Sequence, residues 1–372
     1  MVKVYEVKNK NDLKKFISLP YRLYKNDKNW IPPIKKSERE YWTRHPGLKK
    51  NPVKLFLAEK DGKIAGRIAF LINKRYNELH DKKTARFFAF EAIDDKEVID
   101  QLFEKAEAEA KEHGMNHIHG PLGFNNLDHQ GMQVEGFDWP QTMVSVYNFP
   151  YYKDHLERLG YRKEIDWIEN RIRLNENAIK RGKIGRQIIE KRYGLKAWQP
   201  ANKEEFISVT EDIFKLYNEA YKNLPYMVPL DDEEIEFYKK SYMQVLLPEW
   251  AFFAREPEQN KIVAFLITMP SLGDALRKAK GRLFPFGFYY IMQALKKPKE
   301  IDAAIIGADP EYDNKGAAVI VFEKFHEVML KYGVDTFETG GVFETNKPVL
   351  ANWKNYDAIQ HKRKRVYGKS LS

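Results

Sequence analysis

Residues 305–318 combine the residue types that can hold a phosphate group. An apolar strand is expected to end at Pro310, and small residues then open a helix at Gly316, with Lys315 adding positive charge. Free amides at a helix N-terminus attract an anion, and a glycine lets the anion approach the backbone. A strand that stops pairing at a proline also leaves amides and carbonyls for an extended amide ligand. The alternative is an ordinary strand–loop–helix connection.

Two glutamates close to the next expected strand could accept a proton. Glu338 ends the strand expected over residues 335–338, and Glu344 follows it. A carboxylate can take the proton of an amine that attacks a carbonyl carbon, so both glutamates are candidate general bases. Exposed glutamates are common, and the alternative for each is an ordinary surface side chain.

Histidines are the candidate metal ligands of this chain. His117 and His119 alternate onto one face of an expected strand, and Asp128 and His129 follow. A metal site would need these side chains to converge. Histidines in strands and loops are usually structural or solvated, so we expect no metal. The absence of cysteine excludes thiolate ligands and a cysteine nucleophile.

Composition indicates a globular protein of about two domains. The 372 residues are 43% hydrophobic and 31% charged, and the N-terminus does not read as a signal peptide. Apolar runs fall well short of the ~20 residues of a spanning helix, so we expect a cytoplasmic protein with no membrane contact. The net charge of +10 favours anionic partners. The one dense basic run, residues 361–365, is predicted to be a frayed, solvated end.

The elements that would position these residues are mixed α and β in both halves of the chain. Asp61–Gly62 predicts a hairpin in the first half, and paired strands recur after residue 250. Asp94 or Asp95 is expected to begin a long helix, and an equivalent helix follows Gly316. This repetition indicates a diverged duplication. We predict two domains, 1–178 and 179–372, joined by a basic helix.

The segment 305–318 resembles the central motif of the GNAT superfamily, a strand followed by P-x-x-[QR]-x-x-G-x-[GA] and a helix. The run from Glu338 to Asn346 resembles the next strand of that fold and its asparagine. Residues 29–33 and 136–161 resemble a bacterial GNAT-like family of tandem architecture. The resemblance therefore implies an α/β protein of two GNAT-like domains in tandem.

The resemblance also implies a binding role for each residue of the motif. The CoA pyrophosphate would lie at the helix N-terminus, pantetheine would lie along the strand, and the cysteamine end would approach the following asparagine. The implied cofactor residues are Gly307, Ala308, Asn314, Lys315, Gly316, Ala317, Ala318 and Asn346. The helix of the first half opens with Asp94–Glu97, whose carboxylates would exclude an anion. The acyl-CoA site is therefore expected in the second half.

Two positions depart from the GNAT pattern. Asp313 stands where the family usually has glutamine or arginine, and its carboxylate would repel phosphate if it pointed inward. Trp353 stands where many members have the tyrosine that reprotonates the CoA thiolate. Tyr356 is close enough in sequence to take over that role, which completes a candidate catalytic set with Glu338 and Glu344.

The resemblance implies an N-acyltransferase that uses acetyl-CoA or another acyl-CoA. Its acceptor would be a small-molecule or peptide amine. Two alternatives stay open: a degenerate GNAT scaffold that binds a ligand without transfer, and a Fem-type peptidyl transferase that uses aminoacyl-tRNA. No strong basic or aromatic platform for RNA is evident, so tRNA is the one nucleic acid considered as a partner.

Overall fold

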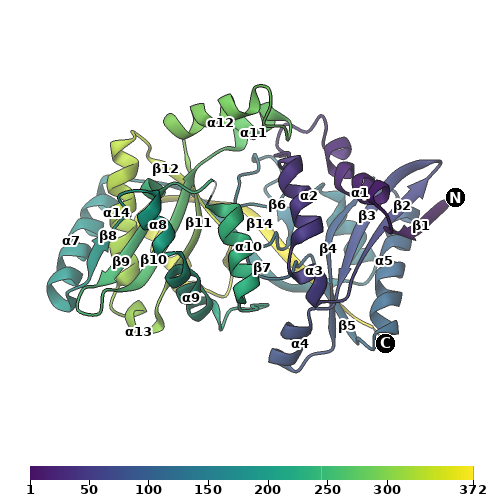
Figure 1. Ribbon diagram of the computed structural model, residues 1–372, viewed down its shortest axis with the longest axis horizontal. Coiled ribbons are helices and arrows are strands. Elements are labelled where there is room, and N and C mark those ends of the chain that lie inside the picture. Colours follow the sequence, from purple (N-terminus) through teal and green to yellow (C-terminus); the bar gives the residue numbers. More distant parts are fainter. Residues whose placement is uncertain (244, 372) are drawn as a thin grey trace.

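The computed structural model describes residues 1–243 and 245–371, and it contains one mixed sheet of 14 strands flanked by helices (Figure 1). The strand order is β1-β2-β3-β4-β5-β14-β7-β12-β11-β10-β9-β8, with β6 paired to β14 and β13 paired to β7. The mixed α/β class predicted from the sequence is confirmed. Among the described residues, no helix combines the length and apolarity needed to cross a membrane.

The first half of the chain supplies one end of the sheet and the helices that cover it. Its elements are β1 (Val2–Glu6), α1 (Lys10–Leu23), α2 (Lys35–Arg44), α3 (Gly47–Lys50), β2 (Val53–Lys60), β3 (Lys63–Leu71), α4 (Lys74–His80), β4 (Thr84–Ala92), α5 (Lys96–Glu112), β5 (His117–Gly120), β6 (Met132–Glu135), α6 (Tyr151–Arg158) and β7 (Arg162–Arg173).

The second half begins with the predicted basic helix, α7, and supplies the other end of the sheet. Its elements are α7 (Glu176–Tyr193), β8 (Lys196–Trp198), α8 (Lys203–Ser208), α9 (Thr210–Tyr221), α10 (Asp232–Tyr242), η1 (Pro248–Trp250), β9 (Ala251–Glu256), β10 (Lys261–Pro270), α11 (Gly273–Ala279), α12 (Gly287–Lys296), β11 (Ile301–Ala308), α13 (Pro310–Asp313), α14 (Ala317–Lys331), β12 (Thr336–Thr339), β13 (Val342–Phe343), α15 (Lys347–Asn352), η2 (Trp353–Asn355) and β14 (Asp357–Ser370).

Both halves repeat the same order of strand pairs. Antiparallel neighbours lead to one parallel pair, β4–β5 in the first half and β11–β12 in the second. In each half a long helix, α5 or α14, connects the parallel strands and covers an apolar core. Local signals behave as predicted, since the Asp95 carboxylate accepts a hydrogen bond from the Val98 amide at the start of α5.

The two halves are joined by the last strand of the chain. β14 pairs with β7 from Asp357 to Gly368, and it also pairs with β5 of the first half. The prediction that residues 361–365 form a frayed, solvated end is therefore wrong. The run is an interior strand because its cations meet acids from distant parts of the chain. The Arg365 guanidinium bonds both carboxylate oxygens of Asp166, at 2.8 and 3.0 Å.

Candidate functional site

A slot opens in the sheet where the parallel strands β11 and β12 separate. Their pairing covers only Ile301–Ala303 and Phe337–Thr339, and the Gly340 amide makes the last bond, to the Ala303 carbonyl at 2.9 Å. β11 stays paired with β10 on its other side up to Ala308. Residues 304–306 and 340–342 are half-buried on the two sides of the gap. Pairing with β12 therefore ends at Ala303, well before Pro310, where the sequence predicted the break, and strand edge is left for an extended ligand beyond that point.

The wall of the slot is formed partly by residues predicted to face pantetheine. Gly307 is buried, and a Cβ there would lie 2.7 Å from the Phe265 ring, so this glycine is needed for packing. Ala308 is half-buried beside it. The Tyr221 hydroxyl donates a 2.9 Å hydrogen bond to the Ile306 carbonyl, and burial raises the pKa of Tyr221 to about 12. One carbonyl of the slot is therefore already paired.

The predicted phosphate seat lies at the start of α14. Gly316 precedes the helix with φ of +80°, and no side chain caps the first amides. The Gly316 amide donates a hydrogen bond to the Asp313 carbonyl. A Cβ on Gly316 would lie 2.7 Å from the Ile189 side chain of α7. The seat is thus covered on one side, and no side chain among the described residues caps the first amides of α14, those of Ala317 and Ala318.

The rest of the loop before α14 faces outward. Asp313 and Asn314 are exposed, so the Asp313 carboxylate is not turned into the corner. The Lys315 ammonium lies over the Tyr312 ring, 4.1 Å from its centroid. Lys315 is therefore close to the seat and does not form an ion pair within the described residues.

The corresponding gap in the first half is filled by tyrosines. β4 and β5 pair only over Thr84–Arg86 and His117–His119, but the strand after that point is covered. The Tyr151 hydroxyl donates to the Ala92 carbonyl at 2.7 Å, and the Ala92 amide donates to the Tyr152 hydroxyl at 2.8 Å. In the first half, tyrosine hydroxyls therefore bond both the amide and the carbonyl of Ala92, whereas in the second half a tyrosine hydroxyl bonds the Ile306 carbonyl.

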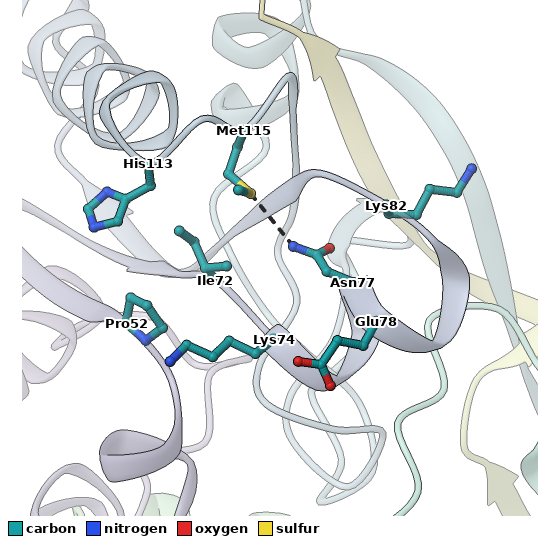
Figure 2. Close-up of a pocket in the computed structure, with 8 residues that line it drawn as sticks. All are labelled: Pro52, Ile72, Lys74, Asn77, Glu78, Lys82, His113 and Met115. Carbon is teal, nitrogen blue, oxygen red and sulfur yellow. Dashed lines mark hydrogen bonds between the residues drawn. The ribbon is translucent and has the colours of Figure 1, made fainter.

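A shallow pocket of about 350 Å³ lies on the first half, away from both gaps (Figure 2). Its wall combines apolar side chains with charged rims, and none of its residues was predicted to act in catalysis. The lining residues are Pro52, Ile72, Lys74, Asn77, Glu78, Lys82, His113 and Met115. The pocket is therefore separate from the candidate site.

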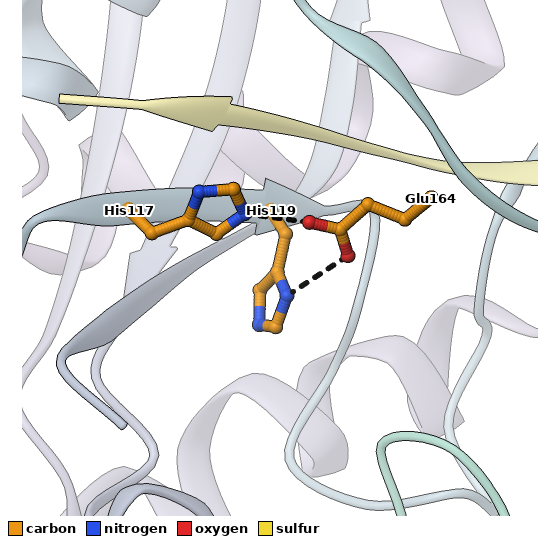
Figure 3. Close-up of side chains that lie close together, drawn as sticks. All are labelled: His117, His119 and Glu164. Carbon is orange, nitrogen blue, oxygen red and sulfur yellow. Dashed lines mark hydrogen bonds and ion pairs between the residues drawn. The ribbon is translucent and has the colours of Figure 1, made fainter. Parts of the chain in front are cut away.

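His117 and His119 do converge, but on Glu164 rather than on Asp128 and His129 (Figure 3). The His117 Nε2 and His119 Nδ1 atoms lie 2.5 and 3.3 Å from the two Glu164 oxygens. Burial opposes ionisation of Glu164, yet the histidine hydrogen bonds prevail and lower its pKa. Burial lowers the pKa of His119 to about 4. The Tyr226 hydroxyl also donates to Glu164, at 2.6 Å, while His119 Nε2 has no hydrogen-bond partner among the described residues.

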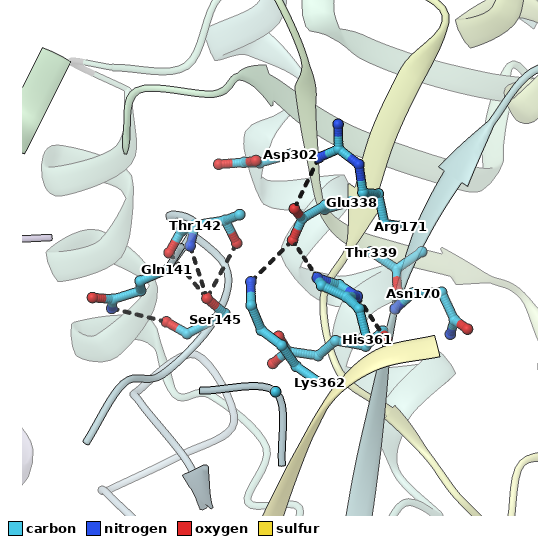
Figure 4. A network of polar contacts seen from close by, with 12 residues as sticks. Gln141, Thr142, Ser145, Asn170, Arg171, Asp302, Glu338, Thr339, His361 and Lys362 are labelled. Atoms are coloured by element: carbon cyan, nitrogen blue, oxygen red, sulfur yellow. Dashed lines mark hydrogen bonds and ion pairs between the residues drawn. The ribbon is translucent and has the colours of Figure 1, made fainter. Parts of the chain in front are cut away.

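A buried charged centre lies where the two halves meet, close to the closed end of the slot (Figure 4). The Glu338 carboxylate accepts hydrogen bonds from His361 Nε2 at 2.9 Å and from the Lys362 ammonium at 3.1 Å. The Arg171 guanidinium lies 3.4 Å away. Burial opposes ionisation of Glu338, but these cationic partners outweigh it and lower its pKa. Glu338 is therefore an anion held in place and a poor proton acceptor.

Asp302 is a titratable group of this centre that the sequence did not single out. It lies on β11 in register with Glu338, and it is fully buried. Burial, and secondly the charge of Glu338, raise the pKa of Asp302 to about 7. One oxygen accepts a hydrogen bond from the Met143 amide at 3.1 Å, and the other has no partner within the described residues. The sequence signal that could have identified Asp302 is a carboxylate at the start of an otherwise apolar strand.

The three predicted catalytic residues are not brought together. Phe337 packs near Tyr356, while its neighbour Glu338 points to the opposite face of the sheet, because side chains alternate along a strand. The Tyr356 hydroxyl lies 3.3 Å from His326 Nε2 beneath α14, and burial raises its pKa to about 12. Glu344 forms an ion pair with Lys163 at 2.7 Å.

Asn346 and Trp353 both make contacts that stabilise the fold. The Asn346 side chain accepts a hydrogen bond from the Val349 amide and caps α15. Trp353 is buried against Phe322 and Phe337 in the core under α14. Of the three predicted catalytic residues, Glu338 lies in the charged centre, and Asp302, which the sequence did not single out, lies beside it.

Comparisons with known proteins agree with the architecture. No family model matches the chain. It is 29% identical over 374 residues to Protein YghO of Escherichia coli K12, which covers 98% of this chain and 94% of that protein. It is 26% identical over 389 residues to a Caulobacter vibrioides protein named bacterial ceramide synthase, over 99% of this chain and 97% of that protein.

Among solved structures, a tandem GNAT protein from the clavulanic acid biosynthesis pathway aligns with a TM-score of 0.57. The alignment covers 100% of this chain and 99% of that protein, at 9% sequence identity. A likeness at this identity concerns the fold alone. The structure and this comparison together confirm that the chain has the tandem GNAT fold implied by its motif.

Proposed function

We propose that this protein is an N-acyltransferase that moves an acyl group from acyl-CoA to an amine. The observation that carries the proposal is the slot between β11 and β12, which leaves backbone groups unpaired beside the start of α14. Pantetheine is an extended chain with two amide groups, so it can pair with such an edge. The amides of Ala317 and Ala318 would face the diphosphate.

The charged centre supports the chemistry of acyl transfer. An amine must lose a proton as it attacks the thioester, and a base whose pKa lies near the working pH is suited to that step. Asp302 has this property and lies next to Ala303, at the closed end of the slot. We assign the proton acceptor to Asp302 and a positioning role to Glu338, which replaces the catalytic set expected from the sequence.

The relative named bacterial ceramide synthase supports a choice of acceptor. A ceramide is the amide of a fatty acid and a long-chain amino alcohol, so its formation is an N-acylation. We therefore favour a long-chain amine over a peptide amine as the acceptor of this protein, and a long acyl chain on the CoA donor. Both assignments are open to direct measurement with a panel of donors and amines.

The site can be tested with two variants at the start of α14. Ala318→Asp places a carboxylate in the first helical turn, where it suits the helix dipole but repels a diphosphate. Ala318→Asn has the same shape without the charge. Acyl-CoA should raise the melting temperature of the wild type and of A318N, and A318D should lose most of this shift. Equal shifts in all three proteins would place the CoA elsewhere.

A second function is favoured by a specific observation, the partial filling of the site. Ile189 covers one side of Gly316, and the Tyr221 hydroxyl donates a hydrogen bond to the Ile306 carbonyl. A GNAT scaffold that binds a ligand without transferring a group would tolerate both features. Stabilisation by acyl-CoA without any product from the amine panel would support this function over catalysis.

A further inference from the structure

An aromatic and basic excursion projects from the sheet between β10 and β11. It comprises α11, α12 and their connections, residues 271–300, and it lies along the upper edge of the molecule in Figure 1. Four large apolar side chains of this excursion are exposed to solvent: Phe284 by 79%, Phe286 by 67%, Phe288 by 56% and Tyr289 by 59%. Such a group of neighbouring exposed aromatics marks an interaction surface.

The excursion packs on the rest of the protein through a different face from the one that carries the exposed aromatic side chains. Ile291 and Leu295 of α12 pack on Leu276 of α11, and this cluster reaches Ile31 of the first half. The Gly281 carbonyl accepts a hydrogen bond from the Lys35 amide at 3.2 Å, which ties the turn to the same half. The excursion is therefore anchored through one face and presents the aromatics on the other.

The excursion is predominantly basic. Between Asp274 and Glu300 the chain carries seven basic residues and no acidic one. The two flanking acids are already engaged, Asp274 with Arg277 and Glu300 with Arg171. Six of the basic side chains are exposed and form no ion pair within the described residues: Lys278, Lys280, Arg282, Lys296, Lys297 and Lys299.

We propose that this excursion docks the protein on the surface of an anionic lipid bilayer. Aromatic side chains enter the interfacial region of a bilayer, and flanking lysines and arginines are attracted to anionic headgroups. Contact of this kind needs no spanning helix. A second copy of the chain is a poorer occupant, because a two-fold contact would bring the same basic residues of both copies together.

The position of the excursion gives this docking a consequence for the site. The chain leaves the sheet after Pro270 and returns at Ile301, one residue before Asp302, and the Ser271 amide donates to the Glu300 carbonyl at 2.9 Å. A protein held by this excursion keeps the charged centre close to the bilayer. The docking proposal does not depend on the proposed acyl transfer, because it predicts binding to lipid alone.

Sedimentation with vesicles tests the proposal on the full-length protein. The wild type should sediment with phosphatidylcholine vesicles that contain phosphatidylglycerol, and added salt should weaken the binding. The triple variant F284S/F286S/F288S should bind at least about tenfold more weakly, because it loses three interfacial anchors. The variant K296E/K297E should lose binding to anionic vesicles by a similar factor, since each basic residue contributes to the attraction.

A matched control uses two exposed apolar residues outside the excursion, Ile184 and Ile188 on α7, exposed by 47% and 56%. The variant I184S/I188S should bind vesicles like the wild type. The proposal is overturned if the wild type stays in the supernatant with anionic vesicles, or if the control variant loses binding equally. It is also overturned if the wild type is a lipid-free dimer that the triple phenylalanine variant dissociates.

Discussion

The buried carboxyl of Asp302 leads to a prediction about stability and pH. Its pKa is raised from 3.8 to about 7 by burial and by the charge of Glu338. At about 1.4 kcal/mol for each pH unit, this shift corresponds to at most about 4 kcal/mol. Because the folded-state pKa is the higher one, the folded protein binds the proton more tightly. Its stabilising effect is complete below about pH 4 and is lost as the pH rises through about 7.

The variant Asp302→Asn isolates this contribution, because asparagine keeps the shape and an oxygen for the Met143 amide. It cannot ionise, so its advantage over the wild type should grow by about 3 kcal/mol between about pH 5 and about pH 8. Urea unfolding followed by tryptophan fluorescence at the two pH values measures this difference. A gap between the variant and the wild type that does not change with pH would refute the reasoning. If Asp302 is also the proton acceptor, D302N is stable but inactive.

Three other changes probe the same region and the joint between the halves. Glu338→Gln leaves buried cations unpaired and should lower the free energy of unfolding by about 3–5 kcal/mol, whereas a loss below about 1 kcal/mol would show that the centre is solvated. Tyr221→Phe frees the Ile306 carbonyl, so it should tighten acyl-CoA binding while costing about 1 kcal/mol of stability; weaker binding by calorimetry would contradict the assignment of the slot. Gly368→Ala should destabilise the fold by about 1–3 kcal/mol in thermal melts, because its Cβ would lie 2.0 Å from a Glu164 oxygen, and an unchanged melting temperature would refute this.

Local chemistry made much of the fold predictable from the sequence. The hairpin at Asp61–Gly62 follows from two residues that accept positive φ, and both have it, at 51° and 72°. The turn around Pro310 and the helix after Gly316 likewise depend on residues adjacent in sequence. The motif at this point also led to the correct tandem fold.

Long-range partners explain what the sequence did not reveal. The run 361–365 appears solvated because its acidic partners, Asp166 and Glu338, come from other strands. Tyr356 was expected to replace the tyrosine absent at position 353, but its hydroxyl lies 3.3 Å from His326 Nε2, on the face of the sheet opposite Glu338, and sequence spacing does not reveal that placement. Asp302 was missed because its raised pKa depends on burial and on a charge from another strand. Ala318 is a better position than Gly316 for testing the phosphate seat. Any side chain at Gly316 would be strained, because φ is +80° there and a Cβ would lie 2.7 Å from Ile189.

The placement of β14 has a consequence for biosynthesis on the ribosome. Strands β5 and β7 emerge early, yet the strand that lies between them, β14, follows every other strand of the sheet in sequence. Until Asp357–Ser370 is released, both strands present open edges that can pair with another nascent chain. The first half therefore cannot complete its sheet until β14 has emerged, and chaperone protection during that interval would matter more for this protein than for one whose halves close in turn.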